Sequence, residues 1–422
     1  MSLQGPIVVV GDQLYPELVT ALGEAGAFPV VETPWSNAPA AIAKIEPAAV
    51  ILNETEARPQ GATADELRKA IDNAGGAHMP VLARTKPGAS PRVATALPIA
   101  GDAPPSRIIA RLASALRVRT LHAAALRRAD AFGSEIQDLP ALPDTDPLDD
   151  ATVLVLGRGG TYPDLAIAVG ERVGLIGALS IETAARFLNE RDVDGVALGD
   201  GFGPRLVEAF LTVIAEDARF RDLPIAVLSG VPIGIDRLLL PNLEQMRGDP
   251  VDIVERMLPL VRIHAFAARL QRLLAAIEAK GMLDPATGLF TIAAFLRDLQ
   301  RALQEAKDTG GTLSLALFSF AKELDRRANM DAARLVSRLV RKADFACHAS
   351  DGSILVAFSG TTLRSAHVVA RRIASVLKHT MVTIDGSQGR ISPSVTLACL
   401  KANDTIESLL GRVSEPVAEA AE

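Results

Sequence analysis

Short apolar runs alternate with helical patterns along the first 250 or so residues, and this rhythm limits the folds open to the chain. The first five runs lie at residues 6–10, 28–31, 48–52, 79–83 and 97–100. Amphipathic stretches separate them, and a long helical pattern at about residues 105–131 follows the last run. Strands that alternate with helices of this length predict a parallel sheet with right-handed crossovers.

The same rhythm occurs a second time after a polar interruption. Residues 138–150 are rich in proline and aspartate, a composition that opposes both helix and sheet. Apolar runs then return at residues 152–156, 173–178, 195–198 and 225–228. We therefore expect two consecutive five-stranded α/β domains, at residues 1–137 and 151–258, joined by a linker at residues 138–150.

Composition narrows the class of protein. The 422 residues are 49% hydrophobic and 4% aromatic, enough for two or three cores built from Ala, Leu, Val and Ile. A formal net charge of −6 argues against a nucleic-acid surface. The N-terminus lacks the pattern of a secretory signal, and no segment approaches the roughly 20 apolar residues that cross a bilayer. Cys347 and Cys399 are too few for a disulfide framework and suit a reducing compartment. Taken together, these features predict a cytoplasmic protein that binds neither nucleic acid nor membrane.

A helical pattern at residues 252–280 carries a heptad seam, and Pro259 just ahead of the seam predicts a kink or a restart. The apolar residues of the seam are spaced three and four apart in strict alternation: Leu260, Ile263, Ala267, Leu270, Leu274 and Ile277. Such a seam predicts pairing with the same helix of a second protomer. The alternative is one amphipathic helix packed on its own domain. We expect a homodimer, with residues 259–283 as a connecting helix.

The C-terminal residues carry two motifs that belong together. Asp284-Pro285-Ala286-Thr287-Gly288-Leu289 follows the helix directly, and an Arg-x-x-Asp motif, Arg341 and Asp344, lies ahead of the turn at residues 350–354. In this order they resemble the entry motif and the signature hairpin of the GGDEF family, the cyclases that make cyclic di-GMP. The resemblance implies an α/β GGDEF (nucleotidyl-cyclase-like) domain at residues 284–422.

The resemblance also implies that the cyclase site has decayed. The family's reaction needs two magnesium ions held by carboxylates from the first strand and from the signature turn. Here Ser319 stands at the strand position and Ala321 replaces the second acid, while residues 322–331 replace the guanine-reading segment. The turn Gly-Gly-Asp/Glu-Glu-Phe is replaced by Ser350, Asp351, Gly352, Ser353 and Ile354. We expect no cyclase activity, no cofactor and no metal, since the six histidines show no ligand spacing either.

The inhibitory site of the family is implied at Arg341, Asp344 and Arg372. Guanidinium groups make bidentate contacts to phosphate and to guanine edges, and a carboxylate accepts hydrogen bonds from guanine N–H groups. These three residues therefore predict a cyclic di-GMP site. The alternative is that Arg341 and Asp344 form only an ion pair at a helix end.

Both α/β domains resemble the receiver domains of two-component signalling, which are flavodoxin-like. A receiver needs an acidic pair after its first strand, a phosphoryl-accepting aspartate after the third and a Thr or Ser after the fourth. The first domain offers one acid, Asp12, with Asn53 at the acceptor position and Thr85 as the hydroxyl. Because an amide accepts no phosphoryl group and magnesium needs paired carboxylates, we do not expect aspartyl phosphorylation there.

The second domain has Gly157 and Arg158 in place of the acidic pair. Its acceptor position aligns with Gly199, Asp200 comes one place late, and Ser229 keeps the hydroxyl. Phosphorylation of Asp200 therefore stays open.

The order receiver, receiver, GGDEF resembles the PleD- and PopA-like response regulators. It implies a non-catalytic regulator that binds cyclic di-GMP and so controls recruitment of a protein partner. A second hypothesis is a scaffold that binds no nucleotide and acts through dimerising receiver surfaces. A third, an active diguanylate cyclase, lacks its metal ligands in this sequence.

Overall fold

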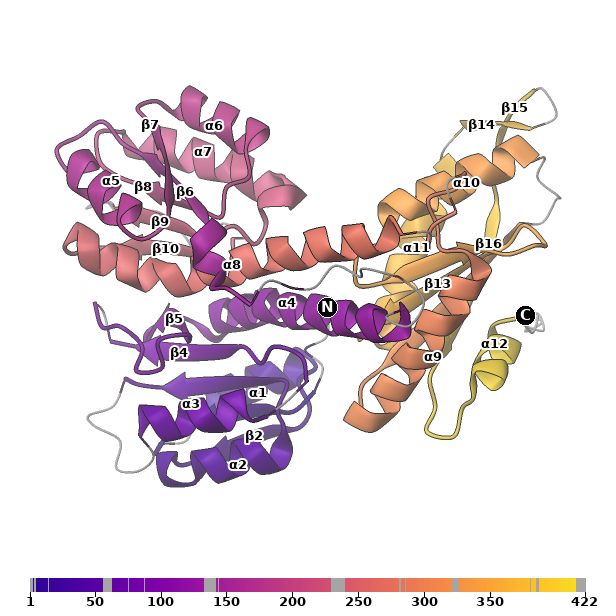
Figure 1. Cartoon of the computed structure of the whole chain (residues 1–422), viewed down its shortest axis with the longest axis horizontal. Helices are drawn as coiled ribbons and strands as arrows, with labels where there is room; N and C mark the ends of the chain where they lie inside the picture. Colours follow the sequence, from indigo (N-terminus) through magenta and orange to yellow (C-terminus); the bar gives the residue numbers. More distant parts are fainter. Residues whose placement is uncertain are drawn as a thin grey trace. The chain divides into compact units, whose positions relative to one another are not determined.

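The computed structural model describes residues 3–414 except 4, 14, 56–62, 75, 87, 133–141, 143, 229–239, 281, 285, 321–325, 380 and 385–386. For residues 132, 326–327 and 381–389 the backbone alone is described. The chain divides into two units (Figure 1). The tandem unit holds Pro6–Arg119 and Pro143–Arg269, and the C-terminal unit holds Met1–Gly5, Thr120–Leu142 and Leu270–Glu422.

The first domain of the tandem unit is built on a parallel sheet with strand order β2-β1-β3-β4-β5. This is the flavodoxin-like strand order. Its elements are β1 (Ile7–Val10), α1 (Pro16–Glu24), β2 (Val30–Thr33), η1 (Trp35–Asn37), α2 (Ala38–Ile45), β3 (Ala49–Asn53), α3 (Ala64–Asp72), β4 (Val81–Thr85), β5 (Leu97–Ala100) and α4 (Pro105–Phe132). The parallel sheet predicted from the alternating pattern is confirmed.

The second domain repeats this topology, with strand order β7-β6-β8-β9-β10. It comprises η2 (Pro147–Asp150), β6 (Thr152–Leu156), α5 (Tyr162–Gly170), β7 (Gly174–Ala178), α6 (Ile181–Glu190), β8 (Gly195–Leu198), α7 (Pro204–Glu216), η3 (Ala218–Phe220), β9 (Ile225–Leu228), β10 (Leu243–Met246) and α8 (Pro250–Glu278). Strand β10 has no continuous apolar run. In its Leu-Glu-Gln-Met sequence the first and last residues are buried, and the two polar residues between them are half-buried at the edge of the sheet.

The apolar runs form strands because both faces of each sheet are covered. In β6, Leu154 and Leu156 pack with α6 and α7, while Val153 and Val155 pack with α5 and α8. Successive side chains of a strand point to opposite faces, so a strand covered on both sides needs apolar residues at every position. This is why the runs at these positions are continuous and do not alternate.

Polar contacts along α4 join the two domains of the tandem unit. Arg111 is fully buried, and its guanidinium donates to the carbonyl oxygens of Pro98 and Pro241 and pairs with Glu244. Asn242 donates to the hydroxyl of Ser114 at 3.2 Å. Pro98 lies in β5 of the first domain and Pro241 lies just ahead of β10 of the second, so one side chain contacts both domains.

The C-terminal unit contains an antiparallel sheet with strand order β12-β13-β11-β16. Its elements are α9 (Ile292–Thr309), β11 (Leu313–Phe320), α10 (Arg326–Leu339), β12 (Phe345–His348), β13 (Ile354–Ser359), α11 (Leu363–His379), β14 (Met381–Ile384), β15 (Ser387–Arg390), β16 (Pro393–Cys399) and α12 (Ile406–Ser414). Helices α9 and α12 cover one face of the sheet, and α10 and α11 cover the other. Strands β14 and β15 form a separate hairpin.

The seam of α8 is packed inside its own chain. Leu260, Leu270, Leu274 and Ile277 are each at most 1% exposed. Ile277 lies in the core of the C-terminal unit. The seam is therefore taken up by the chain's own cores, which is the alternative to pairing with a second protomer. Pro259 lies inside the continuous helix.

Part of the expected linker at residues 138–150 is ordered by two arginines of α8. Arg269 donates to the carbonyl oxygens of Thr145 and Asp146, and its guanidinium pairs with Asp150 at 2.6 Å. Arg262 pairs with the Asp146 carboxylate at 2.9 Å. Residues 138–141 and 143 lie outside the described residues. In the part of the chain that is described, no helix is both long and apolar enough to cross a membrane.

The fold predicts that the two cysteines react differently with thiol reagents. Cys347 is buried in β12, and burial raises the pKa of its thiol to about 12, whereas Cys399 is half-buried on β16. Because thiolate is the reactive form, iodoacetamide at about pH 8 should label Cys399 and spare Cys347 in the folded protein. Peptide mapping by mass spectrometry measures both sites, and a urea-unfolded sample is the control. Labelling of Cys347 at the unfolded rate would contradict the fold around β12.

Candidate functional site

Arg341 and Asp344 form a closed ion pair between the end of α10 and the start of β12. The Nε atom of Arg341 lies 2.6 Å from Oδ2 of Asp344. Its Nη2 atom donates to the carbonyl oxygen of Ser359 and to the hydroxyl of Thr361, both at 2.8 Å. The guanidinium is therefore held by three groups in one orientation, while 32% of the side chain stays exposed.

Asp344 is enclosed on all sides, with 3% of its side chain exposed. Oδ1 accepts from the backbone N–H of Ser359 at 3.0 Å, and Oδ2 accepts from Arg341. Burial raises the pKa of this carboxyl, and the Arg341 guanidinium and the Ser359 N–H oppose that rise. Asp344 thus orients Arg341 and exposes almost no surface of its own.

Two arginines near the end of α4 lie behind this pair, and no motif in the sequence points to them. Arg127 and Arg128 share the carboxylate of Asp298 on α9, with Nε atoms 2.8 and 3.2 Å from Oδ1 and Oδ2. Asp298 is fully buried, and the two arginine side chains are 5% and 1% exposed. Burial disfavours the charged guanidinium of Arg127, but Asp298 and Glu305 together outweigh it and raise its pKa. We call these residues the Asp298 network.

The network extends to the ends of β12 and β13. Arg128 donates to the backbone carbonyl of Asp344 at 3.2 Å, and Arg127 donates to the hydroxyl of Ser359 at 3.3 Å. Arg128 also pairs with Glu278 at 2.7 Å, and the other oxygen of Glu278 pairs with Lys342 at 2.9 Å. Two of the three residues that contact Arg341, Asp344 and Ser359, are therefore hydrogen-bonded to arginines of α4.

Three positive and three negative side chains balance in the Asp298 network. Arg127, Arg128 and Lys342 face Asp298, Glu278 and Glu305. Each arginine also lies over an aromatic ring, Arg127 over Phe345 at 5.5 Å and Arg128 over Phe290 at 4.9 Å. Buried charges persist in proteins when each has a partner. The one signal in the sequence is the Arg-Arg pair inside an otherwise alanine- and leucine-rich helical pattern.

Arg372, the third residue predicted for the nucleotide site, is exposed on α11. The buried residues of this helix are Ala366, Ala370, Ile373 and Leu377, and at 100° per residue Arg372 points away from them. The structure thus brings Arg341 and Asp344 together and places Arg372 on an outward helix face.

Three of the residues predicted from the sequence to stand at cyclase positions carry hydroxyl groups: Ser319, Ser350 and Ser353. Ser319 lies near the end of β11, half-buried and opposite the exposed Ser394 of β16. In the hairpin turn, the Asp351 carboxylate accepts from the N–H and hydroxyl of Ser353, which lower its pKa. Ser350 is exposed and Ile354 is buried. Ala321 and residues 322–325 lie outside the described residues.

Gly352 is fixed as glycine by its backbone and by its neighbour. Its φ angle is +84°, which favours glycine. A Cβ atom there would lie 2.5 Å from the amide nitrogen of Asn329, whose Oδ1 in turn lies 3.0 Å from Nε2 of His348. Asn329 thus occupies the space beside the turn where the side chain of an acidic residue would begin.

In the first α/β domain, the predicted receiver positions lie at the carboxyl ends of the strands. Asn53 is buried at the end of β3, where its amide donates to the Tyr15 hydroxyl and its Oδ1 accepts from Thr55 at 2.8 Å. Asp12 is exposed and accepts from the backbone N–H of Trp35 at 3.2 Å. Thr85 is buried at the end of β4. The Tyr15 side chain thus binds the amide that stands at the acceptor position.

In the second domain, Asp200 covers the glycine-rich loop that precedes α5. Its Oδ1 accepts from the hydroxyl of Thr161 at 2.5 Å and from the Thr161 N–H at 3.3 Å. A Cβ atom on Gly159 would lie 2.3 Å from this carboxylate. Gly199 is buried, and Ser229 lies outside the described residues.

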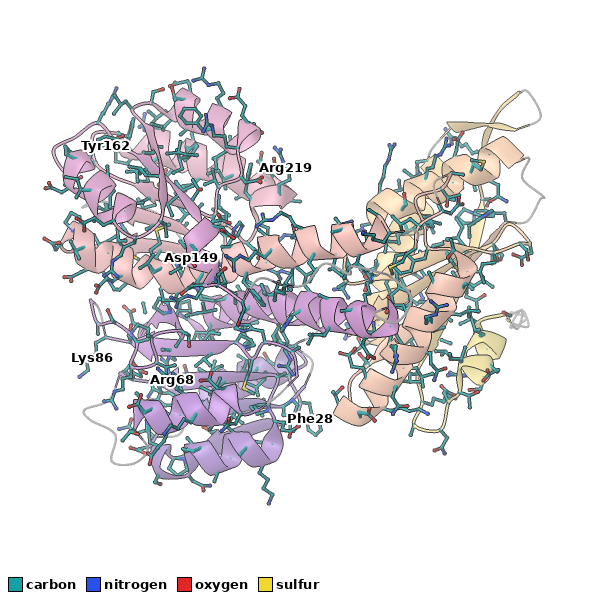
Figure 2. All side chains as sticks on the ribbon, viewed as in Figure 1. Phe28, Arg68, Lys86, Asp149, Tyr162 and Arg219 are labelled. Atoms are coloured by element: carbon teal, nitrogen blue, oxygen red, sulfur yellow. The ribbon has the colours of Figure 1, made fainter. Side chains whose placement is uncertain are left out.

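Tyr162, labelled in Figure 2, is the first residue of α5 in this domain. Its side chain lies close to Gly157 and Gly177. A Cβ atom would lie 3.1 Å from its ring if added to Gly157, and 2.4 Å from its hydroxyl if added to Gly177. These close approaches favour glycine directly after β6, at Gly157, and within β7, at Gly177. The loop is a short turn between β6 and α5.

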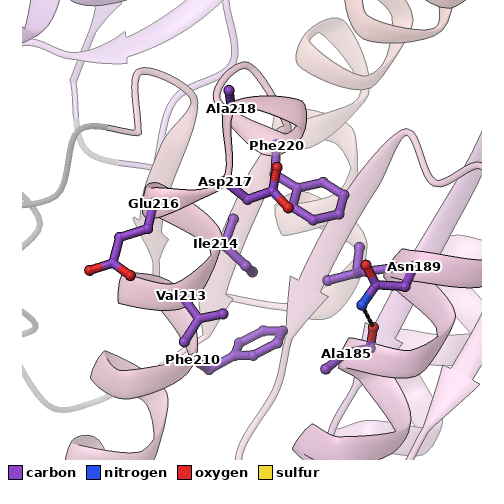
Figure 3. Close-up of a pocket in the computed structure, with 10 residues that line it drawn as sticks. Ala185, Asn189, Phe210, Val213, Ile214, Glu216, Asp217, Ala218 and Phe220 are labelled. Atoms are coloured by element: carbon purple, nitrogen blue, oxygen red, sulfur yellow. Dashed lines mark hydrogen bonds between the residues drawn. The ribbon is translucent and has the colours of Figure 1, made fainter. Parts of the chain in front are cut away.

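A shallow apolar hollow of about 440 Å³ lies between α6, α7 and η3 of the same domain (Figure 3). Apolar side chains dominate its lining, and its charged members are Glu216 and Asp217. Arg219 lowers the pKa of Asp217 and also donates to Asn189. No residue of the predicted sites lines this hollow.

No family model matches the chain, and no curated protein matches it. It is similar to the solved FimX GGDEF domain from Pseudomonas aeruginosa, with 17% identity, a TM-score of 0.29, and 31% of this chain and 88% of that chain covered. It is also similar to the GGDEF domain of DgcB from Caulobacter crescentus, solved in complex with c-di-GMP. The identity is 19% and the TM-score 0.29, and the alignment covers 31% of this chain and 85% of that chain. A third similar structure is the diguanylate cyclase SiaD from Pseudomonas aeruginosa, in complex with its activator SiaC. The identity is 19% and the TM-score 0.31, and the alignment covers 34% of this chain and 59% of that chain. Each alignment covers about a third of this chain.

The Asp298 network predicts a large loss of stability in the Asp298→Asn variant. The change leaves two buried guanidinium groups without their shared carboxylate, and breaking a buried ion pair costs about 3–5 kcal/mol. The matched control is Asp130→Asn, which breaks the exposed pair with Arg301, at 3.1 Å. Such pairs contribute about 0–1 kcal/mol. Urea unfolding followed by circular dichroism measures both, and equal midpoint shifts would contradict the structural role of Asp298.

Proposed function

We propose that the chain is a non-catalytic signalling regulator that binds cyclic di-GMP through Arg341 and Arg372. The observation that carries the proposal is the held guanidinium of Arg341. It is fixed by Asp344, Ser359 and Thr361, yet a third of its side chain is exposed. A guanidinium that is already oriented loses little side-chain entropy when a phosphate binds.

Asp344 enters this proposal as a positioning residue. From the resemblance to the GGDEF family we expected its carboxylate to accept hydrogen bonds from guanine. In the structure both oxygens already accept, one from Arg341 and one from Ser359. We therefore assign the phosphate and guanine contacts to the arginines, and assign to Asp344 the task of holding Arg341.

The absence of catalysis is part of the same proposal. Ser319 and Ser353 supply hydroxyls, which are poor ligands for the two magnesium ions of nucleotidyl transfer. Asn329 crowds the position of Gly352, where an acidic side chain would be needed. In the described part of the chain, no three His, Cys, Asp or Glu side chains are placed to hold a metal ion.

The two tandem domains are proposed to be receiver-like docking modules without phosphoryl chemistry in the first domain. Its acceptor position is an amide hydrogen-bonded to Tyr15. Asp200 of the second domain is already hydrogen-bonded to Thr161. We propose that both domains provide surfaces for protein contacts.

One observation favours a second function, the nucleotide-independent scaffold. The Arg341–Asp344 pair is fully satisfied without a ligand, as an ion pair at a helix end is. In this reading the pair serves stability, and the chain acts by self-association through its receiver-like domains.

Calorimetric titration with cyclic di-GMP separates the two functions. We expect saturable binding to the intact protein, weakened about tenfold or more by Arg372→Ala, because a charged hydrogen bond contributes about 1.5–3 kcal/mol. Arg372 is exposed, so its removal leaves the fold intact. Arg341→Lys keeps the charge but loses the forked donors, and should also weaken binding. The matched control is Arg338→Ala, which removes an exposed arginine of α10. Absence of heat with the folded wild-type protein would leave the scaffold.

The same protein should make no cyclic di-GMP from GTP and magnesium. The double variant Ser319→Asp, Gly352→Glu should be equally inactive, because a side chain at position 352 is strained at its φ of +84° and must displace the Asn329 amide. Product formation is followed by liquid chromatography, with an active cyclase as the positive control. Magnesium-dependent turnover by the wild-type protein would refute the assignment of β11 and the hairpin turn.

A further inference from the structure

The outward face of α11 is basic and carries no acidic residue. Its exposed cations are Arg364, Arg371, Arg372 and Lys378. No Asp or Glu occurs between Leu363 and His379, although the whole chain has a formal net charge of −6. The helix thus concentrates positive charge on one face of an acidic protein.

These four cations have no ion pair within the part of the chain that the structure describes. Two exposed arginines elsewhere in the same unit each lie near an acid. Arg334 lies 3.7 Å from Asp331, and Arg301 lies 3.1 Å from Asp130. The α11 face is therefore a local field of unneutralised positive charge, which attracts an anionic partner.

The spacing of three of these cations fits a helix. Arg364, Arg371 and Lys378 follow one another at intervals of seven residues, which is about 10 Å along a helix axis. A second helix laid along this face would place one residue opposite each of them every two turns. Acidic residues with a seven-residue period are the matching pattern.

Val368 distinguishes a protein partner from a nucleic acid. Its side chain is 68% exposed and lies one turn after Arg364 and one turn before Arg371 and Arg372. An anionic partner that reaches these cations also covers Val368. A phosphate backbone offers it no apolar contact, whereas an amphipathic helix does.

We propose that the outward face of α11 is a docking surface for an acidic amphipathic helix of a partner protein. Acidic side chains of the partner pair with Arg364, Arg371 and Lys378, and an apolar side chain covers Val368. The inference goes beyond the proposed nucleotide site, because the residues assigned to the partner helix, Arg364, Val368, Arg371 and Lys378, do not belong to that site; only Arg372 of this face does. Nucleotide binding and partner docking can therefore fail separately.

The test uses the full chain and a fluorescein-labelled synthetic helix of about five turns. The peptide carries glutamates every seven residues and leucines between them. Its control has the same composition in scrambled order. We expect fluorescence anisotropy to show that the patterned peptide binds at least tenfold more tightly than the scrambled one, and that added salt weakens the binding.

Charge reversal at either end of the face locates the interaction. Arg364→Glu and Lys378→Glu should each weaken binding about tenfold, and Val368→Ser should weaken it severalfold. Lys69→Glu, an exposed position on α3 with the same change of charge, should leave binding unchanged. All four positions are exposed, and circular dichroism verifies that each variant is folded.

Three results would overturn the proposal. The first is equal affinity for the patterned and scrambled peptides, and the second is equal loss in Arg364→Glu and Lys69→Glu. The third is tighter binding of a DNA duplex of matched charge than of the patterned peptide, which would make the face a nucleic-acid surface. If the wild-type protein bound no cyclic di-GMP, these three tests of the docking surface would still be valid.

Discussion

The carboxylate of Asp298 is the point on which the C-terminal unit depends. It is fully buried between two guanidinium groups from α4, and a carboxylate in that position is stable only while both partners remain. Through Arg127 and Arg128 the same group fixes Ser359 at the end of β13 and the backbone of Asp344 ahead of β12. The desolvation of these charges is offset because each has a partner.

The proposed ligand site follows from this arrangement. Arg341 reaches the surface from a turn whose contacts, Asp344 and Ser359, are both held from behind by α4. A ligand that binds Arg341 therefore meets a preorganised group. Residues up to Arg119 of the same helix belong to the tandem unit, so α4 is shared by the two units.

Much of the fold could be predicted because buried parallel strands need continuous apolar runs. Strand β10 could not be predicted in this way, because its Glu244 and Gln245 are half-buried polar residues at a sheet edge and interrupt the apolar run. The periodicity of the α8 seam could not decide between the two alternatives, because a helix buried by its own chain shows the same periodicity as one paired with another protomer. The burial of Arg127 and Arg128 could not be predicted, because arginine is nearly always exposed and only the tertiary structure brings Asp298 to them.

Hydrogen–deuterium exchange on the intact chain, with and without saturating cyclic di-GMP, tests the central claim most directly. The amide of Ser359 donates to Asp344, and the amide of Asp344 donates to the carbonyl of Arg341, so both report on the held guanidinium. The account predicts slower exchange in peptides that contain these two amides when the nucleotide binds. Bound nucleotide with unchanged exchange there, and protection elsewhere, would contradict it.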